Sequence, residues 1–102
     1  MDSEDKFEWD PNKAASNRAK HGISFEEAKG VFRDTFATEE LDSREDYGEA
    51  RYVVIGMARN KLLFVIYTER GEKIRIISAR KADNDEQNEY YRQKATGWGD
   101  VE

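Results

Sequence analysis

The most regular feature of the chain is a set of three apolar runs, rich in β-branched residues, that follow one another in its second half. They are residues 52–58 (YVVIGMA), 62–68 (LLFVIYT) and 73–80 (KIRIISAR). Runs of this length and composition predict β-strands. Only short polar segments separate them, and gaps this short permit antiparallel hairpins but no parallel crossover. The sequence therefore predicts an antiparallel β-meander.

The alternation within these runs predicts how the strands are buried. The first two runs are apolar at both alternating positions, so both faces of these strands are expected to be covered. The third run alternates less cleanly. If that strand were regular, Lys73 and Arg75 would project from one face and Arg80 from the other. We also expect a short edge strand at residues 7–9 and one short strand within residues 34–41.

Helix signals precede the meander. Asp10 and Pro11 suit the N-cap and the first helical position. We expect this helix to run to about Lys20 or His21. Gly22 then provides a left-handed C-cap.

A second helix is predicted to begin at Ser24, because Ser24 and Glu27 have the spacing of a capping box. Its apolar positions recur at helical spacing, at Phe25, Ala28, Val31 and Phe32. After the meander, Asp83 is expected to cap a last helix that Gly97 ends. The predicted fold class is therefore α+β, with two N-terminal helices, an antiparallel β-meander of three to four strands and a C-terminal helix, in one domain over residues 1–102.

Composition narrows the classes of function. Of the 102 residues 38% are charged, so a thin core beneath a charged surface is expected. The chain has no cysteine, which excludes disulfides, thiolate nucleophiles and cysteine-based zinc sites. With one histidine and no carboxylate spacing typical of a metal site, we expect no metal and no other cofactor. No run is long enough to span a membrane and no signal-peptide pattern opens the chain, so a cytoplasmic protein is expected.

Charge is distributed unevenly along the chain, whose net charge is −5. Residues 1–50 carry −7, residues 51–82 carry +6 and residues 83–102 carry −4. A basic surface is typical of proteins that bind phosphate groups. A solvated face laced with salt bridges would give the same composition, so charge alone leaves both interpretations open.

Two kinds of side chain are candidates for chemistry. Histidine is the side-chain type that exchanges protons most readily near neutral pH, so His21 is a candidate general acid or base, although a histidine at a helix end can also cap the last carbonyls. Arginine binds phosphate in a bidentate geometry, and Arg75 and Arg80 interrupt an isoleucine-rich run. Tyr52 lies among the basic residues and could stack on a base, although core packing would explain it as well.

Several short segments occur in a specific order. They are residues 7–11 (FEWDP), Asn17 with residues 20–23 (KHGI), residues 25–28 (FEEA), residues 48–49 (GE) with Arg51 and Tyr52, residues 67–70 (YTER) and residues 74–80 (IRIISAR). Each segment alone is a weak signal. In this order, over roughly residues 7–91, they resemble the BrnT family of toxins.

The resemblance implies a RelE-like α+β fold and a ribonuclease toxin of a type II toxin–antitoxin system that arrests growth. It implies a partner, a BrnA-like ribbon-helix-helix antitoxin that neutralises the toxin in a heterotetramer, with operator DNA bound only through the antitoxin. The catalytic candidates become His21, Arg70, Arg75 and Arg80. The RNA-binding candidates are Lys20, Arg51, Tyr52, Arg59, Lys61, Lys73 and Lys81.

A metal-independent route fits these residue types. The RNA 2′-hydroxyl would attack the adjacent phosphate while a base takes its proton and an acid protonates the leaving oxygen. Three alternatives stay open. The chain could be a catalytically silent module that acts in operon autoregulation, or a plain nucleic-acid-binding protein, or its basic strip could serve to dock an acidic antitoxin segment.

Overall fold

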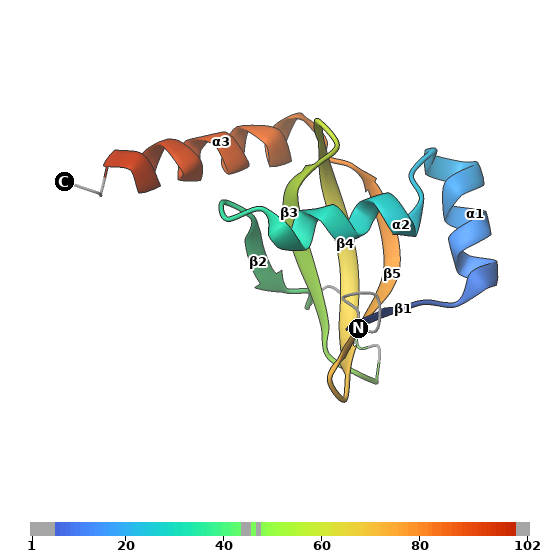
Figure 1. The fold of residues 1–102 in the computed structure, drawn as a ribbon. Helices are drawn as coiled ribbons and strands as arrows, with labels where there is room; N and C mark the ends of the chain where they lie inside the picture. Colours follow the sequence, from blue (N-terminus) through green and yellow to red (C-terminus); the bar gives the residue numbers. More distant parts are fainter. Residues whose placement is uncertain (1–5, 44–45, 47, 100–102) are drawn as a thin grey trace.

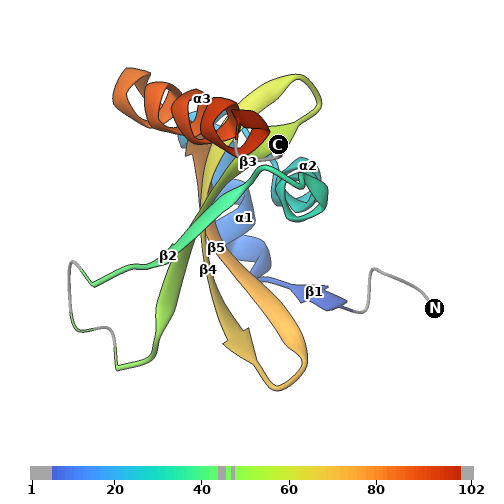
Figure 2. The ribbon, with the colours of Figure 1, turned by 90° about the vertical axis from the view of Figure 1, so that its left-hand side faces the viewer.

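The computed structural model describes residues 6–43, 46 and 48–99. Its elements are β1 (Phe7–Glu8), α1 (Pro11–His21), α2 (Phe25–Ala28), the 3₁₀ helix η2 (Lys29–Arg33), β2 (Thr38–Leu41), β3 (Arg51–Ala58), β4 (Lys61–Arg70), β5 (Lys73–Lys81) and α3 (Asn84–Gly99). The strands form one sheet in the order β1-β5-β4-β3-β2 (Figure 1). Helices α2 and α3 lie on opposite sides of this sheet (Figure 2). The α+β class is as predicted.

The sheet is mixed rather than antiparallel throughout. Strands β2 to β5 pair antiparallel, as the short connections require. Strand β1 pairs with β5 in parallel over two residues. The antiparallel meander therefore has four strands, within the predicted three to four, and β1 adds a fifth strand to the sheet at the edge, where a short edge strand was expected. The parallel pair escaped prediction because it joins segments more than 60 positions apart, and no local pattern carries that information.

A β-bulge interrupts the last strand. Two successive residues of β4, Tyr67 and Ile66, pair with Ile76 and Ser78 of β5, which leaves Ile77 as an extra residue. One extra residue reverses the alternation beyond it. Arg75 and Arg80 consequently lie opposite even-numbered positions of β4 and project from the same face. The expectation that they face opposite ways in a regular strand is wrong for this reason.

Both faces of the sheet are packed, as the apolar runs predict. The face toward α2 carries the larger core, formed by Ile23, Phe25, Ala28, Val31, Val54, Ala58, Leu63, Val65, Tyr67, Ile76 and Ala79. The face toward α3 carries a smaller core of Val53, Ile55, Leu62, Phe64, Ala82 and Tyr90. The alternate residues of β3 and β4 divide between the two cores, so these strands are buried on both sides.

Helix ends follow the predicted signals. The Asp10 side chain accepts a hydrogen bond from the Asn12 N–H at 2.8 Å, and Gly22 closes α1 at φ 73°. Ser24 and Glu27 form the predicted capping box. The α-helical part of this second helix is short, because it becomes 3₁₀ at Lys29.

The last helix begins as predicted and ends later. Asp83 and Glu86 form reciprocal hydrogen bonds of 2.8 Å between side chain and backbone N–H. The helix continues to Gly99, so the expectation that Gly97 ends it is wrong. A glycine inside a helix costs only about 1 kcal/mol relative to alanine, which neighbouring turns can offset. No helix among the described residues is long and apolar enough to cross a membrane.

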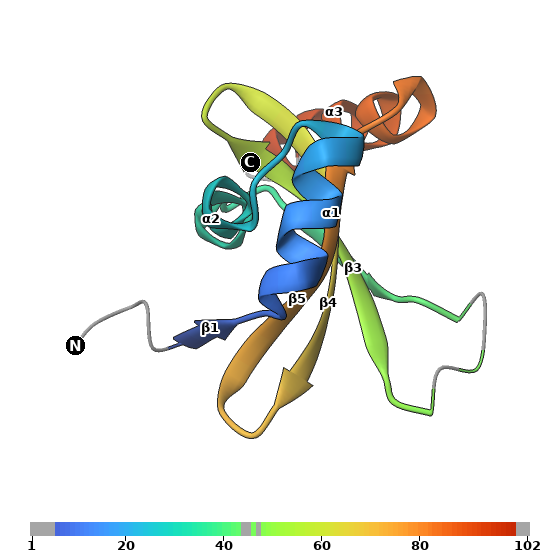
Figure 3. The same ribbon diagram turned by 90° about the vertical axis from the view of Figure 1, so that its right-hand side faces the viewer.

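Asn17 joins α1 to the edge of the sheet. Its side-chain amide is buried and donates to the Ala79 carbonyl at 2.8 Å and to the Ile23 carbonyl at 3.0 Å. Its side-chain oxygen accepts from the Ala79 N–H at 3.1 Å. The amide thus occupies the place of a further strand beside β5, and α1 runs along that edge (Figure 3).

A second polar contact joins α3 to the other side of the fold. The Tyr90 hydroxyl donates to Asp34 Oδ2 at 2.5 Å, and the same carboxylate accepts from the N–H groups of Met57 and Phe36. Burial alone would raise the pKa of Asp34, but these hydrogen bonds outweigh it and hold the pKa below its ordinary value. Burial and the contact with Asp34 raise the pKa of Tyr90.

Replacing Asn17 with alanine should strongly destabilise the protein. The change leaves the buried N–H and carbonyl of Ala79 and the Ile23 carbonyl unpaired, which should lower the free energy of unfolding by about 3 kcal/mol. Urea unfolding measures this loss. Asn12→Ala, an exposed change on the same helix, is the control. Equal stabilities of the two variants would contradict the role given to Asn17.

Replacing Tyr90 with phenylalanine should lower the free energy of unfolding at pH 7 by about 2 kcal/mol, because it removes a buried hydrogen bond to a charged group. The lowered pKa of Asp34 means that this stability is present above the ordinary aspartate pKa, near 3.9, and is lost as pH falls through the native value. Urea unfolding at neutral and acid pH should show the cost shrinking in acid. Tyr91→Phe is the matched control, and a cost of Tyr90→Phe that does not depend on pH would count against this account.

Candidate functional site

Two neighbouring hollows run along the seam between α1 and β5. One, with a volume of about 340 Å³, is lined by Lys13, Ser16, Asn17, Lys20, His21, Ile77 and Ser78. The other, of about 150 Å³, is lined by Asp10, Lys13, Glu49, Arg51, Arg70, Arg75, Ile76 and Ile77. They share Lys13 and the bulged Ile77, so we treat them as one site, the α1–β5 groove.

Helix α1 supplies one wall of this groove. Lys13, Asn17 and Lys20 recur at helical spacing and therefore share a face of the helix. Because Asn17 holds that face against β5, the two lysines and the adjacent His21 line the seam. The His21 imidazole is exposed and forms no hydrogen bond with another described residue, so it does not cap the helix.

The sheet supplies the other wall. Arg51 and Arg75 lie opposite Thr68 on either side of β4, and Arg70 follows two residues later on the same face. This register explains why three arginines that are distant in sequence meet. It also places Lys73 opposite Arg70 at the end of the same hairpin.

Each of these arginines forms an ion pair with a carboxylate of the same chain. Glu49 accepts from Arg51 Nε at 3.3 Å and lies 3.5 Å from an Arg70 nitrogen. Arg75 lies 3.2 Å from a Glu8 carboxylate oxygen. Such half-exposed pairs contribute about 1 kcal/mol or less, so a phosphate can compete for the guanidinium groups. The cations of the groove outnumber the carboxylates beside them, and the site is electropositive.

Arg80 lies outside the groove. Its guanidinium donates to both Glu86 carboxylate oxygens at 2.9 Å and stacks over the Phe64 ring at 3.9 Å from the centroid. It therefore fixes the first turn of α3 to the sheet. These contacts give Arg80 a structural role, the attachment of α3 to the sheet.

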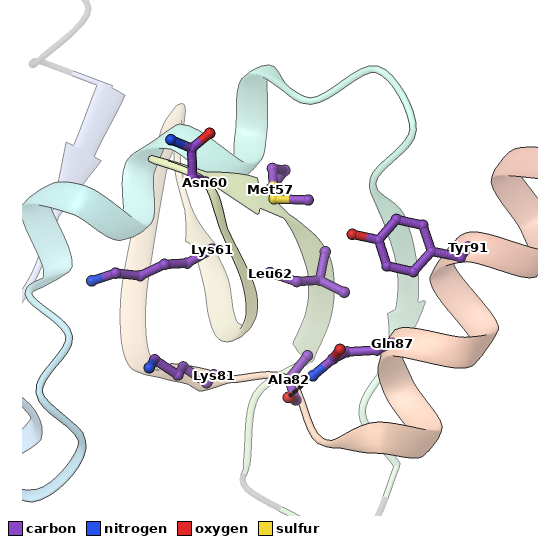
Figure 4. A pocket seen from close by; sticks show the side chains of 8 residues that line it. All are labelled: Met57, Asn60, Lys61, Leu62, Lys81, Ala82, Gln87 and Tyr91. Atoms are coloured by element: carbon purple, nitrogen blue, oxygen red, sulfur yellow. Dashed lines mark hydrogen bonds between the residues drawn. The ribbon is translucent and has the colours of Figure 1, made fainter.

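Three further RNA-binding candidates gather at the opposite end of the sheet. Arg59 and Lys61 flank the β3–β4 turn, whereas Arg70 ends the same ten-residue strand, about 30 Å away. Lys61 also pairs with Glu27 at 3.1 Å. Lys61 and Lys81 line a separate hollow beside α3 (Figure 4).

Tyr52 projects away from the groove. Its ring packs against Tyr67 at 5.4 Å between centroids, on the face toward α2. The structure thus places Lys20 and His21 in one hollow of the groove and Arg51, Arg70 and Arg75 in the adjoining one. The candidates that line neither hollow are Tyr52, Arg59, Lys61, Arg80 and Lys81.

Sequence reasoning missed Lys13 and Ser78, which line the groove. Lys13 lies seven residues before Lys20, a spacing that places both on one helix face, so the sequence held a signal for it. Ser78 carries no such signal, because its side depends on the bulge. Among the residues that the structure describes, no three histidine, aspartate or glutamate side chains gather closely enough to hold a metal ion.

Comparison with known families identifies the chain. A family model described as the ribonuclease toxin BrnT of type II toxin–antitoxin systems matches residues 9–86. The chain belongs to the BrnT family. Membership makes it a ribonuclease toxin that acts on RNA and is paired with an antitoxin. The match includes every residue that lines the α1–β5 groove. No curated protein sequence matches the chain.

The contact between Arg80 and Glu86 should be measurable in stability. Single changes of either residue to alanine should lower the free energy of unfolding, and the double variant should lose less than their sum by about 1 kcal/mol. The matched control is the exposed pair of Arg92 and Glu89 on the same helix, whose coupling should be a few tenths of that. Equal coupling in the two cycles would contradict the structural task of Arg80.

Proposed function

We propose that this BrnT protein cleaves RNA in the α1–β5 groove by a metal-independent reaction. The observation that carries this proposal is that two hollows adjoin along one open seam, because Lys13 and Ile77 line both. One hollow holds Lys20 and His21 from α1, and the other holds Arg70 and Arg75 from the sheet. Phosphoryl transfer without a metal ion needs a side chain that can transfer a proton and cations that stabilise the charge on the phosphate oxygens. A histidine and a row of lysine and arginine side chains are groups of these types.

In the proposed reaction the RNA supplies its own nucleophile. The 2′-hydroxyl loses its proton to a base and attacks the adjacent phosphorus, while the leaving 5′-oxygen receives a proton from an acid. The products are a 2′,3′-cyclic phosphate and a free 5′-hydroxyl. His21 serves as acid or base. Arg70 and Arg75 exchange their carboxylate partners for the phosphate and stabilise the charge that builds on its oxygens.

The remaining cations bind the RNA backbone. Lys13, Lys20 and Arg51 lie in the groove itself, and Lys73 lies at its end beside Arg70. The candidates at the far end of the sheet are Arg59, Lys61 and Lys81, which would contact phosphates several nucleotides away. Arg80 acts as a positioning residue through α3, and Tyr52 acts through the core rather than by stacking on a base.

The family supports a wider proposal. The fold would be RelE-like, and the antitoxin partner would be a BrnA-like ribbon-helix-helix protein that joins the toxin in a heterotetramer. Expression of the toxin alone would arrest growth in the cytoplasm. The complex would bind operator DNA through the antitoxin only.

A second candidate function is a catalytically silent module that acts in operon autoregulation. The observation that favours it is that each arginine of the groove pairs with a glutamate of the same chain. If these ion pairs never open to admit a phosphate, the arginines stabilise the fold and contribute to the binding of a protein partner. The two candidates differ in whether RNA is cut.

The test is cleavage of a defined single-stranded RNA by the purified chain in EDTA. His21→Ala and Arg75→Ala should each lower the rate by about 100-fold or more, because they remove proton transfer and charge stabilisation. Arg33→Ala removes an exposed cation on the α2 side and is the charge-matched control, with the wild-type rate expected. Circular dichroism and urea unfolding verify that each variant is folded.

Three results would count against the proposal. Cleavage of an all-deoxy strand at a similar rate would exclude the 2′-hydroxyl as nucleophile. Activity that EDTA abolishes and magnesium restores would exclude the metal-independent route. Intact RNA with folded wild-type protein would favour the silent module.

A further inference from the structure

The hollow beside α3 that Figure 4 shows lies outside the α1–β5 groove and shares no described lining residue with it. We call it the α3 hollow. Its volume is about 290 Å³. Pockets for small ligands span about 300–1,000 Å³, so this hollow suits a single small group. Leu62 and Ala82 are almost buried and form its floor, and the partly exposed Met57 stands at its side.

Three uncharged polar side chains surround this apolar floor. They are Asn60 from the β3–β4 turn and Gln87 and Tyr91 from α3. The Gln87 amide nitrogen donates to the Ala82 carbonyl at 3.0 Å, which leaves its amide oxygen as an acceptor for a ligand. The Asn60 side chain and the Tyr91 hydroxyl form no hydrogen bond with another described residue. Polar groups around an apolar floor suit a ligand with apolar faces and polar edges.

Tyr91 supplies an aromatic surface to this hollow. The buried Tyr90 ring packs against it in a T-shaped contact, with 5.1 Å between the ring centroids. Even so, 48% of the surface of Tyr91 is exposed. Its hydroxyl is directed toward Met57 and Leu62 (Figure 4). An exposed tyrosine ring that is positioned by a neighbour is typical of the surfaces on which nucleic-acid bases stack.

The charges that border the α3 hollow are positive. Lys61 and Lys81 line it, and no carboxylate is among its described lining residues. Their partners in the sheet, Ala58 and Leu63, belong to the core toward α2, so both lysines project from that face. Their amino groups accordingly point away from Tyr91 (Figure 4). The hollow therefore has a cationic side and an aromatic side.

The α3 hollow lies close to the end of the α1–β5 groove that holds His21. Ser78 lines the groove, and Lys81 lines the hollow three residues later on the same strand. Three residues of a strand span about 10 Å. Stacked nucleotides are about 3.4 Å apart along one strand, so a few of them cover this distance. A strand that lies in the groove beside His21 can therefore reach the hollow.

We propose that the α3 hollow binds one unpaired base of the RNA strand that enters the α1–β5 groove. This proposal rests on the proposed function, because it takes RNA as the ligand. The base stacks on Tyr91, and its polar edge meets Asn60 and the Gln87 oxygen. The adjoining phosphate meets Lys81 on the cationic side. A base in a duplex is stacked on its neighbours and does not enter the hollow, so the hollow selects single-stranded RNA.

The probe is a fluorescein-labelled single strand of eight 2′-O-methyl nucleotides, which has no free 2′-hydroxyl and so is not cut by the proposed reaction. A second strand has the same length and backbone but carries abasic residues. Fluorescence anisotropy should show saturable binding of both strands to the full chain. The base-bearing strand should bind about tenfold more tightly.

Tyr91→Ala should weaken the binding of the base-bearing strand about tenfold and leave the abasic strand within about twofold, because only stacking is lost. Tyr91→Phe keeps the ring and should retain the wild-type affinity within about threefold. Lys81→Ala should weaken both strands equally, by about threefold, because a phosphate contact does not depend on the base. Leu41→Ala is the matched control, since it truncates another large exposed hydrophobic side chain, and it should bind both strands as the wild type does.

Several results would overturn the proposal. One is equal weakening of the base-bearing and abasic strands by Tyr91→Ala, and another is an equal loss of affinity in Leu41→Ala. A third is no saturable binding of the base-bearing strand by wild-type protein that circular dichroism shows to be folded. A free mononucleotide that binds as tightly as the strand and depends on Tyr91 would also overturn it, because the ligand would then be a nucleotide and not RNA.

The proposals for the groove and for the hollow can fail separately. Intact natural RNA, together with binding that depends on Tyr91 and on the bases, would contradict cleavage in the groove and support the hollow. Cleavage that His21→Ala abolishes, together with binding that Tyr91→Ala leaves unchanged, would support the groove and contradict the hollow.

Discussion

The side-chain amide of Asn17 is the contact on which the functional surface depends. Strand β1 covers the outer edge of β5 for only two residues, and beyond it the backbone of Ala79 would be left unpaired without that amide. An amide carries both a donor and an acceptor, so one residue can replace a strand at this point. Because the amide is fixed to β5, α1 must lie along the seam, and the lysines that share its face must line the groove.

The bulge at Ile77 is the second constraint. It brings Ile77 into both hollows and turns Arg80 to the face that carries Arg75. Arg80 can then stack on Phe64 and hold α3 through Glu86. A local irregularity of one residue therefore shapes the α1–β5 groove and also anchors α3 to the sheet.

Local signals in the sequence predicted local structure well. The capping residues Asp10, Ser24 and Asp83 begin helices as expected, and the short polar gaps produced the antiparallel pairs. The parallel pairing of β1 and the bulge were not predictable, because they depend on tertiary contacts and not on neighbouring residues. The helix α3 continues past Gly97 because one glycine is too weak a signal to end a helix. The same limit applied to the candidate site. Basic residues clustered in sequence were separated in space, since successive hairpin turns lie at opposite ends of a sheet.

The separation of the basic residues in space determines how charge is distributed over the surface. The basic middle of the sequence does not form one patch, because its antiparallel strands carry Arg59 and Arg70 to opposite ends of β4. The acidic segments before and after it, in contrast, converge, since Glu40 and Asp85 border one hollow between β2 and α3. A net charge of −5 is therefore compatible with RNA binding. The field of the electropositive groove acts at short range, so acidic residues elsewhere on the surface do not cancel it there.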